Sequence, residues 1–361
     1  MSTYRSLRPG IVRNMRVTRP LAGSQRFFYF LEKKLITTSV ALVASIFVIY
    51  VSCEFFVNAI EWVGKRFNVP KNAIGTILAA FGTALPESIV TLVAVVMGNT
   101  PEQKNIGVGA ALGGPLVLST IAYAVVGASL MAFHRSSDRE GVVCCDCNKL
   151  SVDQIWFLII FMFKILLGFV VFSLKPLTGF LFLTAYGIYC YREMSAREKD
   201  DDIIEPLRLR PKKEEPETVW IVVQTFMSLF FVFIGSHVFV NQLEALSLSV
   251  GIPAHVVALL LSPVATELPE ILNAVIWVRQ GKEMLALSNI SGAMMIQATV
   301  PSAFGLFFTP WLFDTYLTAA GIVTALSIGF LCYTLRCDKL SPRRLTFAAP
   351  FYLIFAATFV L

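Results

Sequence analysis

The chain has 361 residues, of which 56% are hydrophobic and 15% charged, and its mean hydropathy is +0.70. A soluble domain carries about a quarter of charged residues and less than half of apolar ones, so this composition excludes an ordinary soluble protein, a disordered chain and a disulfide scaffold. The net charge of +6 would suggest nucleic acid in a soluble protein, but membrane proteins gather Lys and Arg in cytoplasmic loops, and we expect no nucleic-acid partner.

Apolar stretches that are long enough to cross a bilayer recur along the chain. Five stretches without Asp, Glu, Lys or Arg reach the roughly 20 residues that a hydrocarbon core of about 30 Å requires. They are 35–53, 105–134, 218–243, 284–313 and 315–335. Apolar spans between charged or Pro/Gly-rich breaks predict an all-α membrane protein of about ten transmembrane helices. These helices are centred near Ser45, Ala80, Ser119, Lys164, Leu183, Phe230, Ser262, Gln297, Val323 and Ala356.

Charged segments divide the chain into four parts. A basic N-terminal tail covers 1–34, and the most charged segment, 192–217, holds seven Lys/Arg and nine Asp/Glu and must be solvated. The remaining parts, 35–191 and 218–361, are each expected to be a half of five helices.

The loops between the predicted helices set the expected orientation. Most Lys and Arg follow helices one, three, five, seven and nine, whereas the loops after helices two, four, six and eight hold only Lys104 and Lys175. The first set, with 192–217, is therefore expected in the cytoplasm and both termini outside. A multi-pass protein of the plasma (inner) membrane is expected; the Arg-rich tail resembles a mitochondrial presequence and keeps an organellar membrane open.

The two halves carry the same motif. Gly82-Thr-Ala-Leu-Pro-Glu87 in the second predicted helix corresponds to Ala265-Thr-Glu-Leu-Pro-Glu270 in the seventh, and 109–114 pairs more weakly with 288–293. Five spans, an odd number, separate the copies, so that they enter the membrane from opposite sides. Inverted-topology repeats of this kind are typical of secondary transporters.

Acidic residues within apolar spans mark the candidate site, because a carboxylate in the bilayer is costly and usually functional. Each motif contains a proline, which frees the carbonyl four residues earlier, that of Gly82 or Ala265. Each copy is thus expected to gather at a helix break one released carbonyl, one Thr hydroxyl and one Glu carboxylate: Gly82, Thr83 and Glu87, and Ala265, Thr266 and Glu270. Oxygen ligands alone suit hard cations such as Ca²⁺ and Na⁺.

Glu267 lies three residues before Glu270 and is predicted to face the same side of its helix. The site would then contain three carboxylates, with Glu87 as the third. Three negative charges in a medium of low dielectric need cations or protons, which favours obligatory exchange. A helix kink with a hydrogen-bonded acid is the bland alternative, and the duplication in opposite orientations disfavours it.

The duplicated Leu-Pro-Glu motif resembles the alpha repeats of the calcium/cation antiporter superfamily, which includes the sodium/calcium exchangers. The resemblance covers nearly the whole membrane part and implies ten helices, with Glu87 and Glu270 as the central calcium ligands and Thr83 and Thr266 beside them. The chain departs from the family pattern at Ala84 and Glu267, where the family has serine.

A second family run, Gly-Asn-x-x-Gly-Ser-Asn, is also changed in this chain. In the third helix it is replaced by alanine and glycine, whereas the eighth keeps Asn289 and Ser291 as candidate ligands. Fewer side-chain ligands are therefore expected, and they shift toward the second repeat.

Other polar residues permit two readings each. Lys164, predicted at mid-span, is either a fixed cation paired with a site glutamate or a lysine buried against polar backbone. His237 and Glu244 form a proton route or, more commonly, an interhelical hydrogen bond. Cys144, Cys145 and Cys147 with His134 fit no ordinary zinc pattern, and unligated thiols are expected.

The sequence therefore predicts a secondary active antiporter, not an enzyme, that exchanges Ca²⁺ for Na⁺ or H⁺ by alternating access. No cofactor and no catalytic residue are expected, and the oligomeric state is left open. The alternatives are an intramembrane carboxylate- or metal-dependent enzyme and a cation channel.

Overall fold

The computed structural model describes residues 21–66, 79–133, 147–195, 205–336 and 340–358, with side chains over 35–66, 84–133, 148–192, 205–336 and 340–358. In these ranges the chain forms helices and no strand. The helices of the first half are α1 (Leu21–Arg66), α2 (Ala79–Val96), α3 (Pro101–Val117), the π-helical turn η2 (Leu118–Ala122), α4 (Tyr123–Phe133), α5 (Cys147–Leu167), the short 3₁₀ helix η4 (Lys175–Thr178) and α6 (Gly179–Ser195). Those of the second half are α7 (Thr218–Val250), α8 (Ala254–Thr266), α9 (Leu268–Arg279), α10 (Glu283–Phe308), α11 (Thr315–Arg336), α12 (Pro342–Thr346) and α13 (Ala349–Ala357).

Helices are the expected outcome for these sequences, because a span in lipid must satisfy every backbone N–H and C=O internally. Six helical stretches of the described residues are long and apolar enough to cross a membrane, and the bent pair α8–α9 makes a seventh. α3, η2 and α4 continue one another as a single such stretch, Pro101–Phe133. The remaining predicted spans correspond to the shorter helices α2, α6 and α13.

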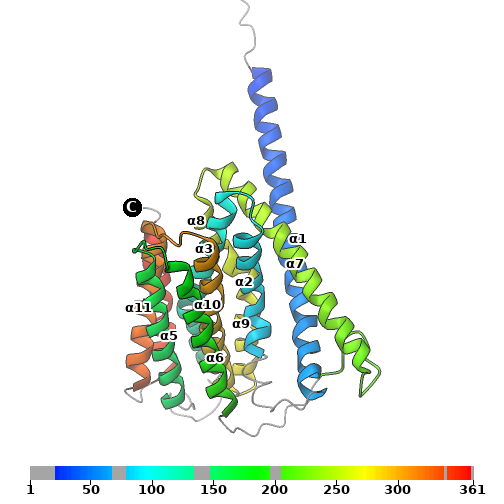
Figure 1. Ribbon diagram of the computed structural model, residues 1–361, viewed down its shortest axis with the longest axis vertical. Helices are drawn as coiled ribbons and strands as arrows, with labels where there is room; N and C mark the ends of the chain where they lie inside the picture. Colours follow the sequence, from blue (N-terminus) through cyan, green and yellow to red (C-terminus); the bar gives the residue numbers. More distant parts are fainter. Residues whose placement is uncertain (1–20, 67–78, 134–146, 196–204, 337–339, 359–361) are drawn as a thin grey trace, which may run out of the picture.

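Helices at matched positions of the two halves make matching contacts with the opposite half. α1 packs on α7, its counterpart, and Figure 1 shows this pair crossing at one side of the other helices. α2 packs on α10 while α8 packs on α3, and the short helix η4 packs on α10 while the short helix α12 packs on α4. These contacts between the halves have partners with the roles reversed, as a two-fold relation between inverted repeats requires. The fold is all-α with two inverted five-helix repeats.

Four connections meet at one end of the molecule, here called the Asp314 end. The Thr100 hydroxyl, before α3, donates to Glu244 near the end of α7 (2.7 Å). The N–H of Phe313, before α11, donates to the Gly168 carbonyl after α5 (3.1 Å). These are the connections after predicted helices two, four, six and eight.

Lys175 joins two of these connections. Its Nζ donates to the carbonyls of Val170 (2.8 Å), Pro310 (3.0 Å) and Trp311 (2.9 Å). Burial lowers the pKa of this ammonium from its ordinary value. Lys175, one of the two lysines predicted in the loops after helices two, four, six and eight, therefore has a structural role.

The opposite end, here called the Arg208 end, holds the described part of the charged segment. Arg208 pairs with Glu54 of α1 (2.6 Å), and the Trp62 indole donates to the Glu205 carbonyl (2.9 Å). Arg66 at the end of α1 donates to the Thr218 hydroxyl at the start of α7 (2.9 Å). The segment between the halves is therefore docked against α1 and α7.

Candidate functional site

Glu87 lies inside α2, and its side chain is 1% exposed. Among the described residues, no donor forms a hydrogen bond with either of its carboxylate oxygens. The carboxylate lies directly on the backbone of α3 at Gly114, where an added Cβ would stand 2.1 Å from Oε2. A residue without a side chain on α3 therefore makes the space that the carboxylate fills.

Glu267 sits at the bend between α8 and α9, where the two helix axes differ by 41°. Its N–H still bonds the Pro263 carbonyl (2.8 Å), but Pro269 has no N–H to continue the ladder. The carboxylate is fully buried and accepts hydrogen bonds from the Thr266 hydroxyl (2.7 Å) and from Nε2 of Gln297 on α10 (2.8 Å). The bend thus places the Glu267 carboxylate inside the helix bundle, where two hydrogen bonds fix its position.

Glu270 is the third acid, in the first turn of α9 and 0% exposed. Its charge acts on Cys53 of α1 as well as on Glu87. Glu87 also interacts with Glu267 and with Lys164. Glu87 is therefore the centre of a buried electrostatic cluster of three acids and one lysine.

The close set of three carboxylates expected from the sequence is not seen in this form. Within the described ranges, no three His, Cys, Asp or Glu side chains converge closely enough to hold one metal ion. Glu87 and Glu267 are neighbours, and Glu270 lies near both Glu87 and Cys53 of α1. The 41° bend separates Glu267, at the end of α8, from Glu270 in the first turn of α9, so the two acids do not share one face of a continuous helix.

The first motif also differs from its prediction. α2 runs as one helix through Pro86, so the helix break expected there is absent, whereas the second copy is divided between α8 and α9. Gly82 and Thr83 lie on α2, but the Thr83 side chain is outside the described residues, while Ala265 and Thr266 are buried at the end of α8. A single proline removes one hydrogen bond, which a well-packed helix tolerates.

The two candidates on α10 are buried as well. The Ser291 hydroxyl accepts a hydrogen bond from Gln154 Nε2 of α5 (3.1 Å). Asn289 is 7% exposed, and its Nδ2 finds no acceptor within the part of the chain that the structure describes. Ser291 is thus engaged with α5, and Asn289 retains an unused polar group.

Gln297 is a site residue that the sequence reasoning missed. It lies on α10 two turns after Asn289 and is the donor that fixes Glu267. A glutamine in the middle of a charge-free span was the available signal, since a buried amide needs partners.

Glu244 has a structural role. It accepts hydrogen bonds from Thr100 (2.7 Å) and from Gln103 Nε2 (2.7 Å), which join the end of α7 to the start of α3. His237 is exposed on α7, so it does not continue a route inward from Glu244. The interhelical hydrogen bond is the reading that the geometry favours. His134, Cys144 and Cys145 lie outside the described residues, as does the side chain of Cys147.

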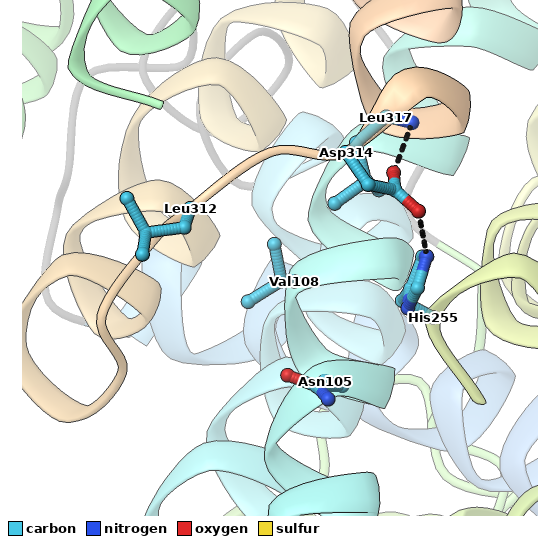
Figure 2. A pocket seen from close by; sticks show the side chains of 6 residues that line it. All are labelled: Asn105, Val108, His255, Leu312, Asp314 and Leu317. Atoms are coloured by element: carbon cyan, nitrogen blue, oxygen red, sulfur yellow. Dashed lines mark hydrogen bonds and ion pairs between the residues drawn. The ribbon is translucent and has the colours of Figure 1, made fainter. Parts of the chain in front are cut away.

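A cavity of about 160 Å³ opens at the Asp314 end, between α3, α8 and α11 (Figure 2). His255 Nε2 lies 2.6 Å from Asp314 Oδ2, and the Leu317 N–H donates to the other Asp314 oxygen (3.0 Å). Its lining residues are Asn105, Val108, His255, Leu312, Asp314 and Leu317. The α3 residues in its wall lie on the helix that reaches Gly114 deeper in the bundle.

Comparison with known proteins identifies the family. A model of the sodium/calcium exchanger protein family matches residues 38–194 and 220–361. The chain belongs to this family. It is therefore a multi-pass membrane antiporter rather than an enzyme, and both halves are covered by the match.

Individual relatives are distant but cover most of the chain. The inner membrane protein YrbG of Escherichia coli is 23% identical over 86% of this chain and 91% of its own length. The putative antiporter CaxA of Alkalimonas amylolytica is 24% identical over 85% and 92%.

Solved structures share the fold. The H⁺/Ca²⁺ exchanger CAX matches with a TM-score of 0.71 at 18% identity, over 94% of this chain and 89% of that structure. The sodium-calcium exchanger NCX_Mj, soaked with 100 mM Na⁺ and 10 mM Sr²⁺, matches with a TM-score of 0.57 at 20% identity, over 90% and 98%.

Proposed function

We propose that this exchanger moves Ca²⁺ across its membrane in exchange for Na⁺ or H⁺ by alternating access. The observation that carries the proposal is the pair Glu87 and Glu270, both buried and at matched positions of two oppositely oriented repeats. A buried carboxyl group inside an apolar bundle either holds a proton or needs a compensating charge, and a divalent cation supplies that charge.

The donor set supports a hard cation. The buried polar groups around the cluster are carboxylates, amides and hydroxyls. The proposed ligands are Glu87, Glu267, Glu270, Thr83, Thr266, Asn289, Ser291 and the carbonyls of Gly82 and Ala265. Calcium prefers such oxygen ligands, whereas soft metals prefer thiolate and imidazole.

Exchange is favoured by the nearness of Glu87 and Glu267. When the cation leaves, two neighbouring acids in low dielectric repel each other, so a monovalent cation or a proton must replace it before the site crosses the membrane. The empty site therefore does not readily return across the membrane unless a counter-ion is bound. A channel would not show this requirement.

The test is uptake of radiolabelled calcium into proteoliposomes under an imposed Na⁺ or H⁺ gradient. Glu87→Gln and Glu270→Gln are each expected to abolish uptake, because an amide keeps the shape and removes the charge that offsets the desolvation of calcium. Glu244→Gln is the matched control and is expected to transport, because Glu244 lies outside the acidic cluster and an amide oxygen still accepts one of its two hydrogen bonds, from Thr100 or from Gln103.

Two outcomes would contradict the proposal. Near wild-type uptake by Glu87→Gln or Glu270→Gln would remove the acidic pair from the site. Calcium flux that needs no ion on the opposite side and does not saturate would indicate a channel instead.

A further inference from the structure

Lys164 is the one cation in the electrostatic cluster around Glu87, within the described residues. It lies in the last turn of α5, which ends at Leu167, and not at the centre of a long span as its sequence context predicts. Its side chain is nevertheless 0% exposed. The connection before α11 covers it, since the indole of Trp311 is buried there and donates to the Lys164 carbonyl (3.2 Å).

The ammonium is held by groups that favour its positive charge. Nζ donates to the Ala111 carbonyl of α3 (2.9 Å) and lies 4.8 Å from the centre of the Phe161 ring. A carbonyl dipole and an aromatic face both stabilise a cation in an apolar surrounding. Neither the Ala111 carbonyl nor the Phe161 ring carries a negative charge that would neutralise the ammonium.

Lys164 and Glu87 meet on the same turn of α3. Ala111, which binds the lysine, precedes by three residues Gly114, against which the Glu87 carboxylate rests. Residues three apart in a helix lie on one face about 5–6 Å from each other. The lysine charge accordingly acts on the Glu87 carboxylate.

We propose that Lys164 is a built-in cation that occupies the place of one monovalent ion beside Glu87 and so fixes the ion stoichiometry. This inference rests on the proposed exchange function. The carboxylates of Glu87, Glu267 and Glu270 carry three negative charges, and the ammonium offsets one of them. The remaining two charges are matched by one Ca²⁺ or by two monovalent counter-ions.

The predicted cycle is therefore electroneutral, and Lys164 makes it so. In Lys164→Gln the amide still reaches toward the Ala111 carbonyl, but the site has one more uncompensated negative charge. Three monovalent ions then replace one Ca²⁺. One net charge therefore crosses the membrane per cycle in the direction of the monovalent ions.

The experiment measures steady-state calcium accumulation in proteoliposomes with and without an imposed potassium diffusion potential. For one net charge per cycle, 100 mV shifts the accumulation ratio by about 50-fold. Wild type and Lys164→Arg are expected to be unmoved by voltage, and Lys164→Gln is expected to show the shift. Equal voltage dependence in wild type and Lys164→Gln would overturn the assignment, because the lysine would then contribute no charge.

A second variant keeps the test decisive if Lys164→Gln does not elute as a folded protein in detergent. Lys164→Met has an unbranched apolar side chain that needs no hydrogen-bond partner, and its calcium exchange is expected to show the same voltage shift as Lys164→Gln; voltage-insensitive exchange by Lys164→Met would overturn the assignment. The two proposals fail separately. Absence of calcium exchange by wild type contradicts the exchange function and removes the basis of the lysine role, whereas active exchange with the wrong voltage dependence contradicts the lysine role alone.

Discussion

Gly114 provides the space for the Glu87 carboxylate, and Gly114→Ala tests this. The new methyl group would lie 2.1 Å from Oε2, so the flexible carboxylate must move while the helices stay in place. We expect a folded protein whose apparent calcium affinity falls about 10- to 100-fold, the usual range for displaced ligand support. Gly187→Ala is the control, because its added Cβ has no atom within 4 Å among the described residues, apart from the adjoining backbone of its own helix. Unchanged calcium affinity in Gly114→Ala would mean that the position of this carboxylate is unimportant.

Glu267 is expected to determine how strongly protons compete with calcium. It neighbours Glu87 and is held by Thr266 and Gln297, so the two acids share one environment. Glu267→Ser removes one member of the pair and should flatten the pH dependence of calcium transport, whichever ion drives it. The measurement is the initial rate of calcium uptake from pH 6 to 8. A pH profile identical to that of wild type would take Glu267 out of the coupling step.

For single residues, the sequence could identify the three buried glutamates but not the distances between them. A carboxylate in an apolar span is conspicuous because its burial is costly. The partners that position it, Gln297 on α10 and Gly114 on α3, come from other helices, and their contacts depend on tertiary packing. The same limit hid the position of Lys164 beside α3.

The bend between α8 and α9 shows that the same sequence motif can adopt different secondary structures in the two repeats. Both copies contain Leu-Pro-Glu, yet α2 continues through Pro86 while the second copy bends by 41° at Glu267. Proline makes a bend possible, and the surrounding helices decide whether it occurs. The π-helical turn η2 after α3 was likewise not predictable from periodicity.

Trp311, in the connection before α11, packs against Gly305 of α10, and this contact leaves little space for a larger residue at position 305. Trp311 has a φ of 49°, which is uncommon for a bulky residue, and its ring would lie 2.0 Å from a Cβ added at Gly305 of α10. Unlike the Glu87 carboxylate, this buried ring has no room to move. Gly305→Ala is therefore expected to destabilise the protein by about 1–3 kcal/mol, the cost of overpacking.

Thermal unfolding of detergent-purified protein measures this effect. Gly329→Ala on α11 is the matched control, since its added Cβ would contact no other described segment of the chain within 4 Å and alanine favours helix. Equal midpoints for Gly305→Ala and Gly329→Ala would show that the Trp311 ring is not confined.

For the whole molecule, the arrangement of loops leads to a prediction of sidedness. The docked segment that carries Arg208 and the connections at the Asp314 end lie at opposite ends, and the former is rich in Lys and Arg. Lys212→Cys, at an exposed position, should be labelled by an impermeant maleimide only from the cytoplasmic side, in a background without Cys144, Cys145 and Cys147. Labelling from outside alone would reverse the orientation and make the basic tail the topogenic signal.

The number of helices and their inverted repeat were predictable from sequence because span length and charge-free composition are local properties. The way the halves interlock was not. Nothing in one motif specifies that α2 packs on α10 or that α3 packs on α8.

That interlocking has a consequence for synthesis. α2 and α3 enter the membrane before their main partners in the second half exist, because α8 and α10 are encoded more than a hundred residues later. The chain therefore holds Glu87 in the bilayer through the translation of α5, α6 and α7 without the surface that finally encloses it. The acidic centre is completed late, although one of its residues is made early, and any truncation before α10 leaves it without Gln297, the α10 side chain that holds Glu267.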